Sequence, residues 1–160
     1  MAATPRWLDK DEYRAWIGYR RMRLLLDAAV ARDLLRASGL SMPDYDVLSA
    51  LTDAPDQRAR LTVLAARMLW SKSRLSRHIS RMEARGLVSR DQNPTDARRI
   101  DVLLTDRGRR AIVEAAPDHV ESARLHFIDR LTVEQLQLFA DIAETVLTHL
   151  PPLAEDADSD

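Results

Sequence analysis

The sequence contains no cysteine among its 160 residues, and this absence excludes several kinds of chemistry at once. Without thiols, the chain cannot form disulfides, thiolate zinc sites or iron–sulfur clusters, and no thiol can sense oxidants. Of its four histidines, His119 and His126 are seven residues apart. On one helix they would lie two turns, or about 10 Å, from each other, too far to share a metal ion. We therefore expect no metal site within one chain and no cofactor.

Long apolar runs are absent as well. No run approaches the roughly 18 residues that a membrane-spanning helix needs, and residues 1–14 lack the apolar stretch of a secretory signal. Hydrophobic residues make up 46% of the chain and charged residues 31%, enough for a core inside a well-solvated surface. We expect one compact domain with helical extensions, located in the cytoplasm and without a membrane partner.

What the sequence does contain is a local excess of positive charge. Residues 67–110 hold 12 Lys or Arg and five acidic residues, an excess of about seven, although the net charge of the whole chain is −1. The other residues therefore carry about −8 together. Positive charge gathered on one contiguous segment is typical of a surface that binds nucleic acid.

Helical patterns occupy most of the chain before this segment and in its first half. Residues 9–37 form a long helical pattern, which Gly39 is expected to end. Ser41, Thr62 and Ser71 are expected to cap three further helices, because their side-chain oxygens can accept the free amides of a first turn.

Two short strands are predicted next, at 87–91 and 100–105, with a turn-rich polar loop between them. Thr105 is expected to cap a helix that kinks or breaks at Pro117, and a further helical pattern follows to residue 130. Thr132 should cap the last helix, which two prolines end at 151–152. The acidic tail, residues 151–160, is expected to be disordered.

This order of helices, tight turn and hairpin predicts a winged helix-turn-helix, in a mainly α (α+β) fold. In the helix after Ser71, the apolar residues Leu75, Ile79 and Met82 recur at helical spacing and should face the core. The opposite face carries the first candidate DNA-binding residues: Lys72, Ser73, Arg74, Ser76, Arg77, Ser80 and Arg81.

Residue types on this face suit a DNA major groove. Arginine can bond guanine in a bidentate way, and small serines between arginines allow a close approach. The alternative is an ordinary solvated face. However, no acid occurs between Lys72 and Arg81, whereas a surface helix built for stability normally interleaves acids with its bases. We therefore interpret this face as a DNA-binding surface.

The tip of the hairpin supplies a second candidate contact. Arg98 and Arg99 lie where a wing would reach a neighbouring minor groove, whose negative potential favours guanidinium groups. Asp96 either pairs with one of these arginines and shapes the loop, or only ends the turn through its side chain.

The segment 85–110 resembles the wing of the MarR (multiple antibiotic resistance regulator) family. The residues that match its pattern are Gly86, Leu87, Val88, Arg90, Asp96, Arg98, Leu104, Thr105 and Gly108. Arg90, inside this motif, completes the candidate DNA-binding set. The chain departs from the family at Met82, which replaces a leucine, and at Leu69-Trp70, where the turn usually holds a glycine. We expect Trp70 to plug this turn or to brace a neighbouring helix.

The resemblance also implies a homodimer. Residues 9–37 and 118–150 would form a helical dimerisation region, and 41–117 the winged DNA-binding domain. The apolar face of the last helix would pack between subunits, although packing within one subunit is the alternative; its residues are Leu136, Phe139, Ala143, Val146 and Leu150. Two-fold symmetry then predicts a pseudo-palindromic operator with half-sites about one helical turn apart.

Family members commonly release DNA when a small aromatic or phenolic compound binds between the dimerisation helices and the winged domain. The corresponding candidate ligand-binding residues are Tyr13, Trp16, Tyr19, Arg20, Arg23 and Tyr45. Aromatic rings with arginines suit a flat anionic ligand, but the same residues can equally serve the core and surface salt bridges.

The function predicted from sequence is therefore a dimeric, sequence-specific transcriptional repressor that such a ligand releases from its operator. The alternative is a non-specific architectural DNA-binding protein, which would bind all sequences alike with a salt-dependent affinity. An enzyme is not expected, because the sequence shows no nucleophile–base pairing, phosphate-binding loop or cluster of metal ligands.

Overall fold

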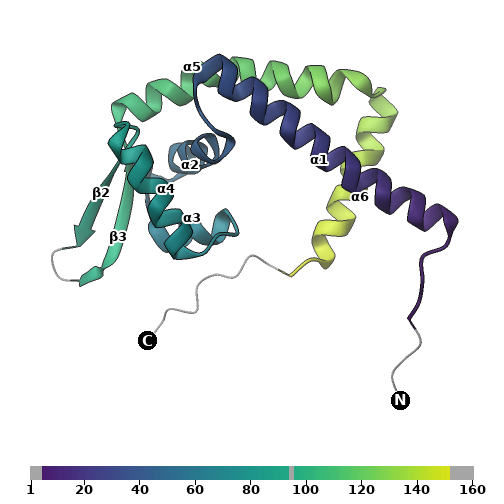
Figure 1. The fold of residues 1–160 in the computed structure, drawn as a ribbon, viewed down its shortest axis with the longest axis horizontal. Coiled ribbons are helices and arrows are strands. Elements are labelled where there is room, and N and C mark those ends of the chain that lie inside the picture. The colour runs from purple at the N-terminus through teal and green to yellow at the C-terminus, as the bar shows by residue number, and fades with distance from the viewer. Residues whose placement is uncertain (1–4, 94–95, 152–160) are drawn as a thin grey trace.

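The structure, a computed structural model, describes the backbone of residues 5–93 and 96–151, and the side chains of these residues except 92–98. Helices dominate, and a three-stranded antiparallel sheet lies at one end (Figure 1). The elements are α1 (Lys10–Ser38), α2 (Met42–Asp53), the 3-10 turn η1 (Pro55–Gln57), β1 (Arg58–Arg60), α3 (Leu61–Arg67), α4 (Lys72–Ala84), β2 (Val88–Asn93), β3 (Asp96–Leu104), α5 (Asp106–His126), the 3-10 turn η2 (Ile128–Arg130) and α6 (Val133–His149). Their order confirms the predicted winged helix-turn-helix.

Local sequence signals set most helix boundaries. Gly39 ends α1 with a left-handed φ of 70°, a conformation that costs glycine little. Ser41, Ser71, Thr105 and Thr132 cap α2, α4, α5 and α6, and each side chain accepts a hydrogen bond from a first-turn amide. These four caps were predicted correctly.

The predicted start of α3 was wrong. The helix begins at Leu61 rather than after Thr62, and no side-chain cap closes it. The preceding residues Arg58–Arg60 pair with β3 as the strand β1, from Arg58 opposite Leu103 to Arg60 opposite Asp101. Three residues of local sequence could not predict this strand, because its partner β3 lies about 40 residues away in the chain.

Two further expectations need correction. α5 does not break at Pro117 but continues from Asp106 to His126 as one helix that packs against α1. Proline removes one backbone hydrogen bond here without ending the helix, and a kink stays a prediction. The strands also extend into the expected loop 92–99, since β2 reaches Asn93 and β3 begins at Asp96. Residues 94–95 of that loop lie outside the described residues.

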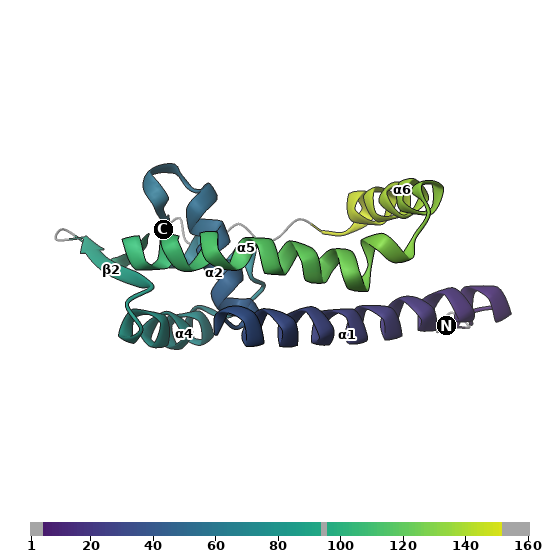
Figure 2. The same cartoon turned by 90° about the horizontal axis from the view of Figure 1, so that it is seen from above.

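The core lies between α2, α3, α4 and the sheet, with the ends of α1 and α5 closing it (Figures 1 and 2). As predicted, the apolar stripe of α4 is part of it. Its largest fully buried side chains are Leu34, Leu48, Leu51, Leu61, Leu64, Leu75, Ile79, Met82, Val47, Val88 and Val102. Because α4 buries this stripe, its opposite face points to solvent.

Two helices extend away from this core. α1 packs along α5, and the N-terminal half of α1 projects beyond the winged domain (Figure 2). α6 contains no buried residue, although Phe139 packs on Phe127 with ring centroids 5.1 Å apart. Many large apolar side chains of both helices are therefore exposed. Among the described residues, no helix is long and apolar enough to cross a membrane.

Candidate nucleic-acid interface

The exposed face of α4 carries the residues that the sequence singled out. Lys72, Ser73, Arg74, Arg77, Ser80 and Arg81 are exposed, and Ser76 is half-buried. The other side of the helix is anchored by Leu75, Ile79 and Met82, none of which has measurable exposure. Because these three side chains are buried in the core, the cationic face of α4 must point to solvent.

Arg90 lies beside α4 rather than on a free surface. Its guanidinium donates to the Ser76 carbonyl at 2.6 Å and to the Ser80 hydroxyl at 2.8 Å, and its backbone amide donates to the Glu83 carboxylate at 3.1 Å. These bonds fasten β2 to α4. They also engage the side chain of Ser80, which the sequence placed on the DNA-facing side, whereas Ser76 contributes only its backbone carbonyl.

The wing is the hairpin of β2 and β3, which extends away from the helices (Figure 1). Arg99 is exposed in β3, and its Nε lies 3.7 Å from an oxygen of Asp101. Arg58 of β1 pairs with the same carboxylate at 3.1 Å. The side chains of Asp96 and Arg98 lie outside the described residues, so their predicted contacts stay predictions.

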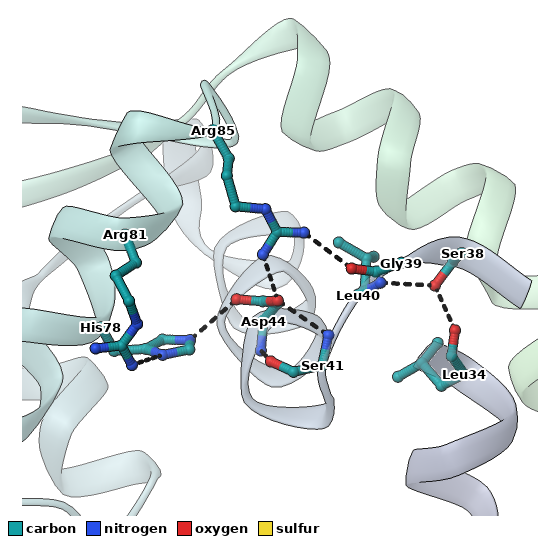
Figure 3. Close-up of polar contacts among 9 residues, drawn as sticks. All are labelled: Leu34, Ser38, Gly39, Leu40, Ser41, Asp44, His78, Arg81 and Arg85. Carbon is teal, nitrogen blue, oxygen red and sulfur yellow. Dashed lines mark hydrogen bonds and ion pairs between the residues drawn. The ribbon is translucent and has the colours of Figure 1, made fainter. Parts of the chain in front are cut away.

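A buried polar network under α4 was missed by the sequence reasoning (Figure 3). Asp44 of α2 is only 3% exposed, and Arg85 at the end of α4 donates to it at 2.7 Å. His78 lies on its other oxygen, with Nε2 at 3.1 Å. Arg85 also donates to the Gly39 carbonyl at 3.0 Å. The network thus ties the end of α4 to α2 and to the turn after α1.

Asp44 is charged in this network. Burial raises the pKa of the carboxyl, but hydrogen bonds from His78, Arg85 and Ser41 outweigh burial and hold that pKa well below its usual range. Asp44 also lies in the first turn of α2, where an acid complements the helix dipole. No local pattern connects it to an arginine on another helix, because only the fold brings the two together.

The unusual turn before α4 behaves as predicted. Trp70 braces α4, because the guanidinium carbon of Arg74 lies 3.7 Å from the centroid of the indole ring. The ring also contacts His78 edge-on, with centroids 5.5 Å apart. The preceding Leu69 has a φ of 55°, the left-handed conformation that favours glycine.

The six candidate ligand-binding residues do not come together within one chain. Five of them, on the N-terminal half of α1, are exposed: Tyr13, Trp16, Tyr19, Arg20 and Arg23. Tyr45 is half-buried on α2, with its ring 4.4 Å from that of His119 on α5. The N-terminal half of α1 points away from α2 (Figure 1), so Tyr45 belongs to a different surface.

That surface contains a groove of about 520 Å³ between α2, the turn before α4, and α5. Its lining residues are Met42, Pro43, Tyr45, Asp46, Ser49, Arg67, Met68, Trp70 and His119. Burial raises the pKa of the Asp46 carboxyl there. His119 Nδ1 is buried without a hydrogen-bond partner among the described residues, so the groove combines aromatic walls with an unsatisfied polar atom.

The second histidine of α5 has separate partners. His126 Nε2 lies 2.7 Å from Asp33 of α1, and hydrogen bonds from His126, Arg36 and Ser122 hold the pKa of Asp33 well below its usual range. Within the described part of the chain, no group of three or more His, Asp or Glu side chains is placed to hold a metal ion.

Known proteins resemble this chain along most of its length. A family model described as the MarR family matches residues 38–99. The transcriptional regulator HosA of Escherichia coli O111:H- is 31% identical over 131 residues, which cover 81% of this chain and 93% of HosA. The chain belongs to the MarR family. Its relatives are transcriptional regulators, and this MarR-family chain is accordingly a DNA-binding regulator.

Two solved MarR-family structures from Streptomyces coelicolor are similar in fold and sequence. Sco3205, in complex with DNA, is 34% identical and has a TM-score of 0.84 over 99% of this chain and 96% of its own. AbsC is 36% identical, with a TM-score of 0.82 over 91% of this chain and 97% of its own. The residues matched by the family model, 38–99, include every candidate DNA-binding residue of this MarR-family chain.

Proposed function

We propose that this MarR-family regulator is a homodimeric repressor that binds a pseudo-palindromic operator through α4 and the wing of each subunit. The observation that carries the proposal is the exposed face of α4. It presents arginines with no acid between Lys72 and Arg81, on a helix whose other side is buried in the core. A repressor of this kind acts by covering promoter DNA, and its place of action is therefore the cytoplasm.

Within this proposal, Arg77 reads a base edge and Lys72 and Ser73 contact phosphates near the amino end of α4. Arg98 and Arg99 approach the minor groove from the wing. Arg90 is reassigned: because it is bonded to Ser76 and Ser80, its role is to set the angle between the wing and α4.

The dimer is supported by apolar surface that one chain leaves uncovered. On α1, Leu24 is 67% exposed and Leu25 57%; on α6, Ile142 is 52% exposed and Leu147 65%. Large apolar side chains gathered on two exposed helices are typical of a surface that another protein covers. Helices from both chain ends would bury it against a second copy, in a two-fold arrangement that gives each half-site one α4.

For the effector, the groove beside Tyr45 is the best-supported location. Trp70 and His119 add flat walls, which suit a small aromatic ligand. Arg67 and Asp46 also line the groove, and Arg67 pairs with Asp53 at 3.5 Å. The five candidate residues on α1 are not part of this groove. Their role in ligand binding stays a separate prediction.

The decisive experiment is a mobility shift on the DNA that flanks the regulator's own gene, in competition with random duplex. We expect preferential binding, loss of about 1–3 kcal/mol of binding free energy in Arg77→Ala, and normal binding in the control Arg36→Ala, whose side chain lies on α1. Equal competition by random duplex would favour the non-specific architectural protein instead. Repeating the assay with a panel of aromatic acids tests release.

A further inference from the structure

We infer that Trp70 is a positioning residue for DNA recognition: it holds the guanidinium of Arg74 in place before DNA binds. This inference rests on the proposed use of α4 as the reading helix. It concerns a residue at which the chain departs from its family and to which the proposed function assigns only a wall of the effector groove.

Trp70 is itself held firmly. Its backbone amide donates to the Ala65 carbonyl at 2.9 Å, and the left-handed Leu69 turns the chain so that this bond can form. The half-buried indole packs against the core. The ring is therefore a fixed platform at the start of α4.

Arg74 rests on this platform. It lies in the first turn of α4, is exposed, and has its guanidinium carbon 3.7 Å from the ring centroid. At this distance a guanidinium gains cation–π attraction from an indole face. A turn that held a glycine here would offer the arginine no ring.

A second arginine of α4, Arg81, is connected to Trp70 through His78. The Trp70 ring meets His78 edge-on at 5.5 Å, and His78 Nδ1 lies 3.0 Å from Arg81 Nη2. Arginine can only donate, so Nδ1 accepts and the ring proton is on Nε2, which faces Asp44 at 3.1 Å. Arg74 and Arg81 thus both rest on the row Trp70–His78–Asp44, part of which is drawn in Figure 3.

The consequence is pre-organisation. Arginine has many rotamers, and ordering them on binding weakens affinity. A guanidinium that is already oriented loses less freedom, and its two parallel donors meet a guanine edge only at a defined angle. Trp70 should therefore affect which base is preferred more than the general attraction to phosphates.

The test is a double-mutant cycle on the full-length protein, read out as affinity for the operator and for its single-base variants. Trp70→Leu removes the aromatic face but keeps apolar bulk; Trp70→Phe keeps a face. We expect Trp70→Leu to lower operator affinity about two- to five-fold, the strength of an exposed cation–π contact, and to lose discrimination at the base where Arg74→Ala loses it. Trp70→Phe should restore most of this discrimination. In the Arg74→Ala background, Trp70→Leu should have no further effect.

The salt dependence of affinity should be the same in Trp70→Leu and the wild type, because phosphate contacts remain. Equal losses from Trp70→Leu with and without Arg74 would overturn the inference and reduce Trp70 to a packing residue. Tighter binding by Trp70→Leu would overturn it too, since the stack would then hold Arg74 away from DNA. Should Trp70→Leu not fold, the cycle of Trp70→Met with Arg74→Ala replaces it, because methionine also removes the ring and its flexible side chain fills irregular space.

Arg77→Ala separates this inference from the proposed function. If Arg77→Ala binds the operator normally, α4 is not the reading helix and the proposed function fails. If Arg77→Ala weakens binding while Trp70→Leu changes neither affinity nor base preference, only the role of Trp70 fails.

Discussion

Asp44 on α2 and Arg85 at the end of α4 form an ion pair of 2.7 Å, although 41 residues separate them in the sequence. The carboxylate is buried, and Arg85 continues to the carbonyl of Gly39 after α1. One arginine thereby connects the helix proposed to read DNA with the two helices behind it. The position of α4 depends on a charged contact as well as on its apolar stripe.

Replacing Asp44 by Asn should destabilise the fold. The charged acceptor for Arg85 and His78 is lost while the polar groups stay in place, and hydrogen bonds to charged groups contribute about 1.5–3 kcal/mol each. We expect the free energy of unfolding at pH 7, measured by urea denaturation, to fall by roughly 2 kcal/mol. An unchanged value would show that the ion pair contributes nothing net.

The same variant should alter the pH dependence of stability. The pKa of Asp44 is lowered in the folded state, so its contribution is complete above the unfolded value of about 3.9 and is lost as pH falls towards the folded pKa. Wild-type stability should therefore decline below about pH 5. Urea titrations at a series of pH values should show a shallower decline for Asp44→Asn.

Gly108→Ala should destabilise the junction between the wing and α5. A Cβ at this position would lie 2.0 Å from the carbonyl oxygen of Leu87, so the backbone must shift, at about 1–3 kcal/mol. The matched control is Gly18→Ala in α1, where nothing lies within 4 Å and alanine should stabilise the helix by about 0.5–1 kcal/mol. Thermal unfolding should move in opposite directions; a shared direction contradicts the prediction.

Leu69→Gly should stabilise the protein. Leu69 has a φ of 55°, and its side chain is 75% exposed, so little packing is lost with it. Release from the left-handed conformation should raise the free energy of unfolding by roughly 0.5–1 kcal/mol after the added flexibility of glycine is subtracted. Leu69→Ala keeps the Cβ and should change stability little. Equal stability of all three proteins would show that the turn is unstrained.

Arg90→Ala distinguishes a bracing role from a DNA contact. Four hydrogen bonds join Arg90 to α4, and the three from its guanidinium are lost in the variant, so the free energy of unfolding should fall by about 1–2 kcal/mol. The exposed Arg77→Ala serves as control and should unfold like the wild type. If Arg90→Ala is fully stable yet binds DNA weakly, the residue contacts DNA directly, as its place in the wing motif first indicated.

Removing both wing arginines should change the salt dependence of binding. If Arg98 and Arg99 each neutralise one phosphate, the slope of log affinity against log salt should become shallower by about 2 in the Arg98→Ala, Arg99→Ala double variant. Base preference should change little. An unaltered slope would show that the wing arginines do not approach the backbone.

Much of this organisation was predictable because it is local. The burial of Leu75, Ile79 and Met82 follows from their helical spacing, and the exposed arginines of α4 follow from the same periodicity. The caps at Ser71 and Thr105 were also recognisable, since a cap depends on residues within one turn. The order of these elements was enough to predict the winged helix-turn-helix.

Other features were beyond such reasoning because they join distant segments. β1 exists only through its pairing with β3. α5 continues through Pro117, so the break that local rules allowed there does not occur. The hydrogen bonds of Arg90 to α4 form only because β2 lies close to α4. The groove beside Tyr45 forms only where α2 lies against α5.

The sequence by itself determined which face of α4 carries positive charge and which face enters the core, because periodicity and residue type are properties of the chain alone. The tertiary structure decided which residues of other elements contact α4 from behind. The contacts of Arg74 with Trp70 and of Arg81 with His78 are local, because each pair lies within about one helical turn. The buried Asp44 comes from α2, and only folding brings it to His78 and Arg85. Hydrogen bonds and ring contacts act over a few ångströms in space, and that proximity is set by the fold rather than by distance along the chain.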